Sequence, residues 1–218
     1  GPCRDHGCSF DHVQPLADAA LVFGPDVAQS LSLLVPVARL RRRRDKVEDR
    51  SGRNIWVGSA HKSLQVSHEL LGAALPDAVR GFPVALFAKY EDNVNTAVKG
   101  AAIAAERLKA QGRNVAVEAS FRLNRNELTL LVIDVTVPII GEPPAALTVA
   151  SQTGYKTLGG AVANRVRDAR PTLLRAIGKR AVWAATRAVA VAREYVLDTG
   201  IALLFAPRIT SVQLTTRT

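Results

Sequence analysis

One stretch of small residues constrains this chain more than any other part of its sequence. Residues 95–112 read as a helix that ends at Gly112, because glycine readily adopts the left-handed turn that follows a helix. Its small residues repeat at helical spacing and form one smooth face, made of Ala97, Gly100, Ala101, Ala104 and Leu108. Such a face lets a helix lie close against a sheet. The stretch therefore predicts a helix packed tightly on a layer of strands.

The same pattern returns at an offset of 88 residues, measured from Ala97 to Ala185, and Gly200 then repeats Gly112. The offset also holds outside the helix, where Pro83 maps to Pro171 and Leu86 to Leu174. Chance similarity between two alanine-rich helices would explain the helix alone but not the aligned residues before it. The sequence therefore predicts a duplicated unit.

Each unit reads in the order β-α-β-α-β-β, which predicts the α+β class and two tandem two-layer domains with two helices on one face of a four-stranded sheet. In the first unit we expect the elements at residues 54–58, 64–79, 83–89, 94–111, 114–123 and 128–138. The matching elements of the second unit are expected at residues 146–150, 155–168, 172–177, 179–197, 201–206 and 211–216.

The predicted domains are an irregular extension at residues 1–50, a first unit at 51–138, a linker at 139–145 and a second unit at 146–218. In the extension, Asp26 is placed to cap a short helix through residues 28–34. The apolar residues 33–37 are too few to span a bilayer, so no membrane is expected as a partner.

The chain has no Met and only two Cys. Absence of Met suggests a processed, imported protein, and the two Cys argue against a secreted disulfide scaffold. The extension contains seven acidic residues, unlike a transit peptide, so we interpret it as part of the mature protein. A mitochondrion or plastid is the expected location, and a bacterial cytoplasm remains open.

Basic charge is concentrated in the second unit. The chain has a net charge of +10. Residues 145–218 hold 11 Lys and Arg against 3 Asp and Glu. Such a surface fits a phosphate backbone, although a solvated surface, an acidic protein or a membrane surface are alternatives. Tyr155, Trp183 and Tyr195 form no obvious stacking platform in the sequence, which argues against base-specific reading of single strands.

Signals for catalysis and metal binding are weak. Four residues of zinc-ligand type lie near the start, Cys3, His6, Cys8 and His12, but their spacing matches no standard structural site. The glycines of the second unit fit no phosphate-binding loop, and its few acids form no spaced pair. We therefore expect no catalytic residue, no metal and no cofactor, and a protein that is not an enzyme.

Residues 176–193 resemble the core motif of the bacterial stage V sporulation protein S family, which has an Ala-Ile-Gly turn before an alanine-rich helix. The second unit keeps the turn as Ala176-Ile177-Gly178 but has Trp183 where the first unit has Asn95. The first unit resembles the helix part, with Asn95-Thr96-Ala97-Val98-Lys99, but lacks the turn. The resemblance covers residues 54–138 and 146–218.

That family is similar in fold to the Alba proteins, small basic dimers that bind DNA or RNA. The resemblance implies two Alba-like units, which pair within the chain or with another copy. It implies binding through the first strand-to-helix loop, the start of the second helix and the last hairpin. Together with the arginine run of the extension, the expected nucleic-acid-binding residues are Arg41, Arg42, Arg43, Arg44, Lys62, Lys99, Arg122, Arg125, Lys156, Arg175, Lys179, Arg180, Arg187 and Arg208.

Our leading hypothesis is a non-enzymatic protein that grips RNA or DNA by its phosphates. An RNA-binding component of an organellar ribonucleoprotein, such as a mitochondrial ribosome, is the setting we favour, with rRNA and other protein subunits as partners. A DNA-binding chromatin-type protein is an alternative. A second alternative is an assembly scaffold that uses the duplicated fold for protein contacts. Convergence of the second unit's basic residues on one face would favour nucleic acid. Basic residues that scatter, or that pair with acids from a neighbour, would favour the scaffold.

Overall fold

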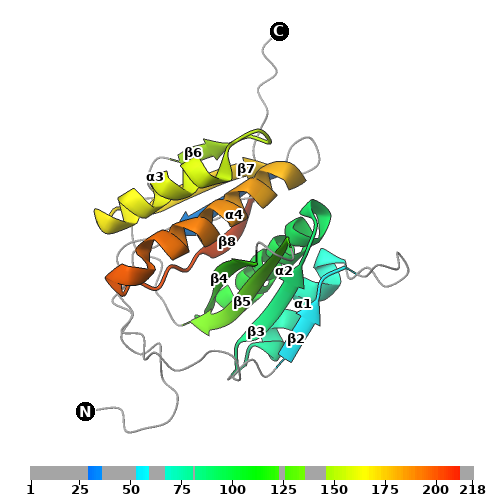
Figure 1. Ribbon diagram of the computed structural model, residues 1–218. Helices are drawn as coiled ribbons and strands as arrows, with labels where there is room; N and C mark the ends of the chain where they lie inside the picture. The colour runs from blue at the N-terminus through cyan, green and yellow to red at the C-terminus, as the bar shows by residue number, and fades with distance from the viewer. Residues whose placement is uncertain are drawn as a thin grey trace, which may run out of the picture.

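The protein, seen here as a computed structural model, is described at residues 29–35, 53–58, 67–80, 82–122, 126–135 and 146–211. Within these ranges the chain forms four α-helices and eight strands, and the strands build two four-stranded sheets (Figure 1). The expected α+β class is confirmed.

The first sheet is built from residues 53–135. Its elements are β2 (Arg53–Trp56), α1 (His68–Ala78), β3 (Val84–Ala88), α2 (Glu91–Lys109), β4 (Asn114–Arg122) and β5 (Glu127–Val135). The strands lie in the order β2-β3-β5-β4, with β2 parallel to β3 and the other pairs antiparallel. The small-residue face of α2 is buried as predicted, including Ala97, Ala101 and Ala104.

The second sheet repeats this arrangement with one difference in chain order. Its elements are β6 (Ala146–Val149), α3 (Tyr155–Arg167), β7 (Thr172–Ile177), α4 (Lys179–Val196), a 3-10 turn (Leu197–Thr199) and β8 (Ala206–Ser211). The strand order is β6-β7-β1-β8, and β1 (Gln29–Val35) comes from the start of the chain. β1 thus occupies the position that β5 has in the first sheet.

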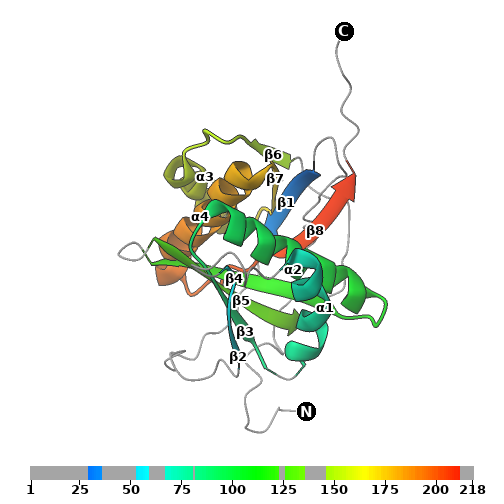
Figure 2. The same cartoon turned by 90° about the vertical axis from the view of Figure 1, so that its right-hand side faces the viewer.

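The helix predicted at residues 28–34 is therefore wrong. β1 pairs antiparallel with β7 on one side and with β8 on the other. Leu33 lies opposite Leu174 and Pro207 and is completely buried. Figure 2 shows the blue β1 between β7 and the red β8. The extension that we expected to lie outside both units supplies a strand of the second sheet. The linker predicted at residues 139–145 lies outside the described residues.

The strand predicted at residues 201–206 is also wrong, because residues 201–204 are irregular and β8 begins at Ala206. Phe205 instead forms an isolated antiparallel bridge with Val117 of β4, with N–H···O distances of 2.8 and 2.9 Å. The two bridge residues are separated by 88 positions, the same offset that separates Ala97 of α2 from Ala185 of α4. Residues 212–216, part of another predicted strand, lie outside the described residues.

The two halves pack through equivalent elements. α4 lies against β4 of the first sheet, α2 lies against β8 of the second sheet, and the two helices contact each other. One continuous cluster of buried apolar residues runs through both halves and includes Leu33, Leu130 and Phe205. The extended segment before β8 and the strand β1 therefore tie two similar layers into one core.

Candidate nucleic-acid interface

The structure describes eight of the expected binding residues. They are Lys99, Arg122, Lys156, Arg175, Lys179, Arg180, Arg187 and Arg208. The other expected residues, Arg41, Arg42, Arg43, Arg44, Lys62 and Arg125, lie outside the described residues, as do Cys3, His6, Cys8 and His12.

The first two residues of α4 make ion pairs with the first two residues of α2. Lys179 Nζ lies 3.0 Å from the Asp92 carboxylate, and Arg180 Nε lies 3.5 Å from Glu91 Oε2. Because α4 follows α2 at the 88-residue offset, Lys179 takes the position of Glu91, and Arg180 that of Asp92. The charges at these equivalent positions are therefore opposite, and the pairs cross from one half to the other.

Two basic residues in a first helical turn are locally unfavourable, because the N-terminal end of a helix carries partial positive charge. α2 follows the usual rule with Glu91 and Asp92, whereas α4 has no acid in its first turn. α4 starts after Gly178, whose φ of 83° and ψ of 158° suit glycine alone. The ion pairs with α2 provide a physical reason for basic residues at this position.

A third ion pair across the halves was not predicted. Arg193 Nη2 of α4 donates to Glu118 Oε1 of β4 at 2.6 Å, and the side chains are 12% and 16% exposed. Arg193 also contacts Glu194 at 3.1 Å. In all three pairs the acid comes from the first half and the base from the second. Reversal of charge at the 88-residue offset was a sequence signal for the pairs of Lys179 and Arg180, whereas Arg193 and Glu118 have the uncharged Ala105 and Ala206 at that offset and no such signal.

Arg187 lies among aromatic rings and not at an open surface. Its guanidinium carbon is 3.7 Å from the ring centroid of Tyr155, 4.3 Å from that of Phe121 and 5.2 Å from that of Trp183. Its Nε is buried and has no hydrogen-bond partner among the described residues. Phe121 belongs to β4, so this cluster joins the two halves. The rings hold the guanidinium plane in one orientation.

Lys99 is the residue of α2 at the position of Arg187. Burial lowers the pKa of Lys99 from its ordinary value, and the nearby Glu69 carboxylate opposes that shift. Arg122 is exposed at the end of β4, opposite the buried Glu127 in the register of β4 and β5. These two first-half candidates thus lie in different surroundings, and the structure does not bring them into one cluster.

Several bases of the second half have no carboxylate within 4 Å in the part of the chain that the structure describes; they are Lys156, Arg165, Arg167, Arg170 and Arg175. The first four lie on α3 or just after it. Arg175 lies on the opposite face of the sheet, because it is exposed while its neighbours Leu174 and Ala176 are buried. The register places Arg208 on that same face, two strands away across Ser32.

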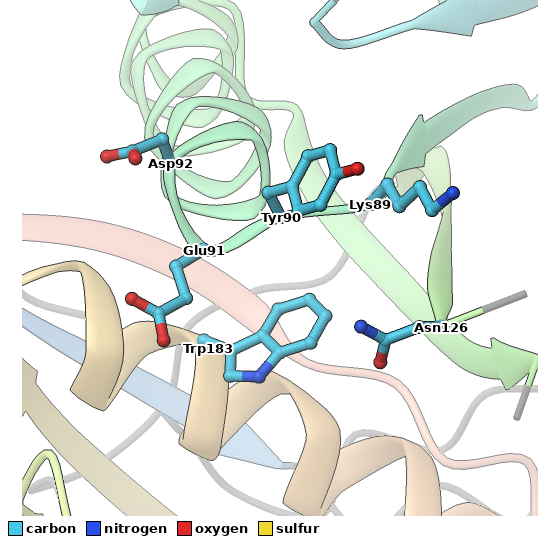
Figure 3. Close-up of a pocket in the computed structure, with 6 residues that line it drawn as sticks. All are labelled: Lys89, Tyr90, Glu91, Asp92, Asn126 and Trp183. Atoms are coloured by element: carbon cyan, nitrogen blue, oxygen red, sulfur yellow. The ribbon is translucent and has the colours of Figure 1, made fainter.

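A pocket opens where the two halves meet. It has a volume of about 330 Å³ and lies beside the start of α2, at residues Lys89, Tyr90, Glu91, Asp92, Asn126 and Trp183. Figure 3 shows the Trp183 indole below the Tyr90 ring in this view, with the Asn126 amide to one side and Glu91 to the other. The Lys89 side chain runs outward from the pocket.

No group of three or more His, Cys, Asp or Glu side chains among the described residues is placed to hold a metal ion. Among those residues, no helix has the length and apolar character needed to cross a membrane.

The second half of the chain matches a known protein family. Residues 145–218 match the family of Stage V sporulation protein S (SpoVS). This result supports that family for the C-terminal part of the chain, which contains β6, α3, β7, α4 and β8. No curated protein and no solved structure gives a match.

Proposed function

We propose that this protein is a non-enzymatic nucleic-acid-binding protein made of two tandem Alba-like units, and that the basic strip on α3 grips phosphates. The strip is defined as the exposed bases Lys156 and Arg167 of α3 and Arg170 just after it. RNA is the favoured partner, in an organellar ribonucleoprotein such as a mitochondrial ribosome. The tandem arrangement is supported by the matching layout of the two sheets, in which β1 takes the place of β5, and by the Val117–Phe205 bridge at the 88-residue offset.

The observation that carries this proposal is the lack of acidic partners along α3. Lys156, Arg167 and Arg170 are exposed, and no carboxylate lies within 4 Å of them in the described ranges. Arg167 instead donates to Asn164 Oδ1 and to the Tyr195 carbonyl, which hold its guanidinium in place. Unneutralised bases on one helix attract a polyanion and release its counterions.

Three bases take a different role in this proposal. Lys179, Arg180 and Arg193 pair with acids of the first half. They align the two units, and only part of their charge remains available to a phosphate. This changes the expected binding surface, because the start of α4 contributes less and α3 contributes more.

The test measures binding of the full chain to duplex DNA and to structured RNA over a series of salt concentrations. The variant Lys156→Glu/Arg170→Glu should make the negative slope of log K against log salt on duplex DNA shallower by about 2, because each lost phosphate contact reduces its magnitude by ~0.9. The matched control, Arg107→Glu/Lys109→Glu, makes the same charge change on exposed residues of α2. Equal effects of both variants would show attraction by net charge alone and would refute the α3 strip.

The scaffold reading is the second candidate, and the three ion pairs between the halves are the observation that favours it. These pairs lie within the chain and hold its two halves together, so the same bases have less charge left for a phosphate backbone. Absence of binding to either nucleic acid at low salt would reject the proposed function and favour this scaffold. A tighter complex with DNA than with RNA would instead favour the chromatin-type alternative.

A further inference from the structure

The pocket between the halves combines two aromatic side chains with an amide. Tyr90 is 62% exposed, just before α2, and Trp183 lies on α4. Trp183 contacts Phe121 edge to face at 6.4 Å and packs on the main core, so its indole is held in place. Asn126 lines the pocket from the turn before β5, with a φ of 48°. A ring fixed by its packing, an exposed ring and an amide thus border one opening.

Charge decides which kind of ligand suits this opening. Glu91 and Asp92 line the pocket, but they already pair with Arg180 and Lys179. A cationic ligand would have to compete with those pairs. A neutral flat ring would not, because it gains from stacking on aromatic faces and from an amide at its polar edge. The asparagine amide offers both a donor and an acceptor to such an edge.

The volume and the surroundings narrow the ligand further. About 330 Å³ accommodates one aromatic ring system in an open pocket, well short of a long ligand. Trp183 also belongs to the cluster around Arg187 and Tyr155, and Tyr155 directly precedes Lys156 of the α3 strip. A single-stranded nucleic acid whose phosphates lie along the strip could therefore reach the pocket past this cluster.

We propose that the pocket receives one unstacked base of a single-stranded nucleic acid whose phosphates lie along the α3 strip. This inference rests on the proposed function and names the form of nucleic acid that the same surface prefers. Unpaired bases can unstack from their neighbours and stack on aromatic side chains, whereas paired bases in a duplex are held inside the double helix. Although the sequence pattern argued against a platform of Tyr155, Trp183 and Tyr195, the fold places Trp183 beside Tyr90 instead.

The experiment uses Trp183 as its own reporter. Trp56 is the other tryptophan, and it stacks on Phe87 at 4.7 Å, so Trp56→Phe preserves a ring there. In this variant of the full chain, a ten-nucleotide single-stranded RNA should quench Trp183 fluorescence, and the duplex of the same sequence should not. Equal quenching by both, or quenching by neither although both bind, would overturn the pocket.

A second measurement compares affinities for the single strand. Tyr90→Ala should weaken binding by about 5- to 150-fold, because loss of one stacked base is worth about 1–3 kcal/mol. Tyr90→Phe should keep the affinity, and duplex binding should not change in either variant. The matched control is Phe82→Ala, which removes a similarly exposed aromatic ring, 66% against 62% for Tyr90, outside the pocket.

The two proposals fail in different ways. If Tyr90→Ala and Asn126→Gly leave single-strand affinity unchanged while salt dependence and the effect of Lys156→Glu/Arg170→Glu persist, the pocket is refuted and the proposed function stands. If no nucleic acid binds at low salt, both are refuted. Thermal unfolding of each variant checks that the fold is intact, and Tyr90 is exposed enough for its loss to leave stability nearly unchanged.

Discussion

The ion pair between Arg193 and Glu118 gives the sharpest test of how the two halves are held together. We would replace Arg193 by Met, which keeps most of the aliphatic stem, and Glu118 by Gln, singly and together. The atoms Nη2 and Oε1 are 2.6 Å apart, and the side chains are 12% and 16% exposed. This pair is far better shielded from water than the Lys179–Asp92 pair, whose side chains are 51% and 61% exposed.

The shielding sets the expected magnitude. A hydrogen bond to a charged group contributes about 1.5–3 kcal/mol, and an exposed ion pair about 0–1 kcal/mol. Arg193→Met should reduce the free energy of unfolding by about 2–3 kcal/mol. Glu118→Gln should cost less, about 1–2 kcal/mol, because Arg193 keeps its contact with Glu194. The coupling energy of the cycle should be about 1–2 kcal/mol.

Urea unfolding followed by tryptophan fluorescence and by circular dichroism provides the free energies, and agreement of the two probes tests two-state behaviour. The same cycle on Lys179 and Asp92 serves as the exposed comparison. A coupling for Arg193 and Glu118 no larger than for that exposed pair would refute the reasoning, since burial would then not strengthen the contact.

Three further predictions concern stability. Gly159→Ala should lower the free energy of unfolding by about 1–3 kcal/mol, because the new Cβ would lie 2.9 Å from the Ala188 carbonyl oxygen. Gly160→Ala has free space around the new Cβ and should stabilise α3 by about 0.5–1 kcal/mol. Equal effects of the two variants on thermal unfolding would contradict this prediction. Leu33→Ala should cost about 2–5 kcal/mol, and an unchanged urea midpoint would mean that β1 is dispensable. Burial lowers the pKa of Lys99 from its ordinary value of 10.5, so the unfolded chain binds the Lys99 proton more tightly than the folded protein does. The free energy of unfolding should therefore rise as the pH increases from the lowered pKa towards 10.5. Urea unfolding at a series of pH values should show this rise in the unchanged protein and not in Lys99→Arg.

Local patterns in the sequence located most helices and strands, and pairing over long distances explains the failures. The strand at residues 172–177 was predicted with its correct bounds, because an apolar run between Pro171 and Gly178 is a local signal. Residues 28–34 were misread because Asp26 suggested a helix cap. Alternation of Ser30, Leu31, Ser32 and Leu33 was the strand signal, but its partners β7 and β8 lie far along the chain.

The candidate site was predicted by residue type more than by surroundings. Basic residues at Lys179, Arg180 and Arg187 were found in the sequence, but their contacts depend on how the two halves pack. Ion pairs and ring contacts, which place these residues at the join of the halves, are set by β4 and α2 of the first half. A single unit viewed alone contains no signal for them.

The position of β1 has a consequence for the order of assembly during synthesis. The first described strand leaves the ribosome early, yet its neighbours β7 and β8 begin at Thr172 and Ala206. The first half contains all four of its strands before β6 begins. It is therefore able to fold before the partners of Gln29–Val35 have been synthesised. The second sheet is then completed only when β1 pairs with β7 and β8. Because β1 is far from both strands in the sequence, this pairing has a high contact order and should be slow. A fragment cut at the family match would lack the central strand and expose the facing edges of β7 and β8.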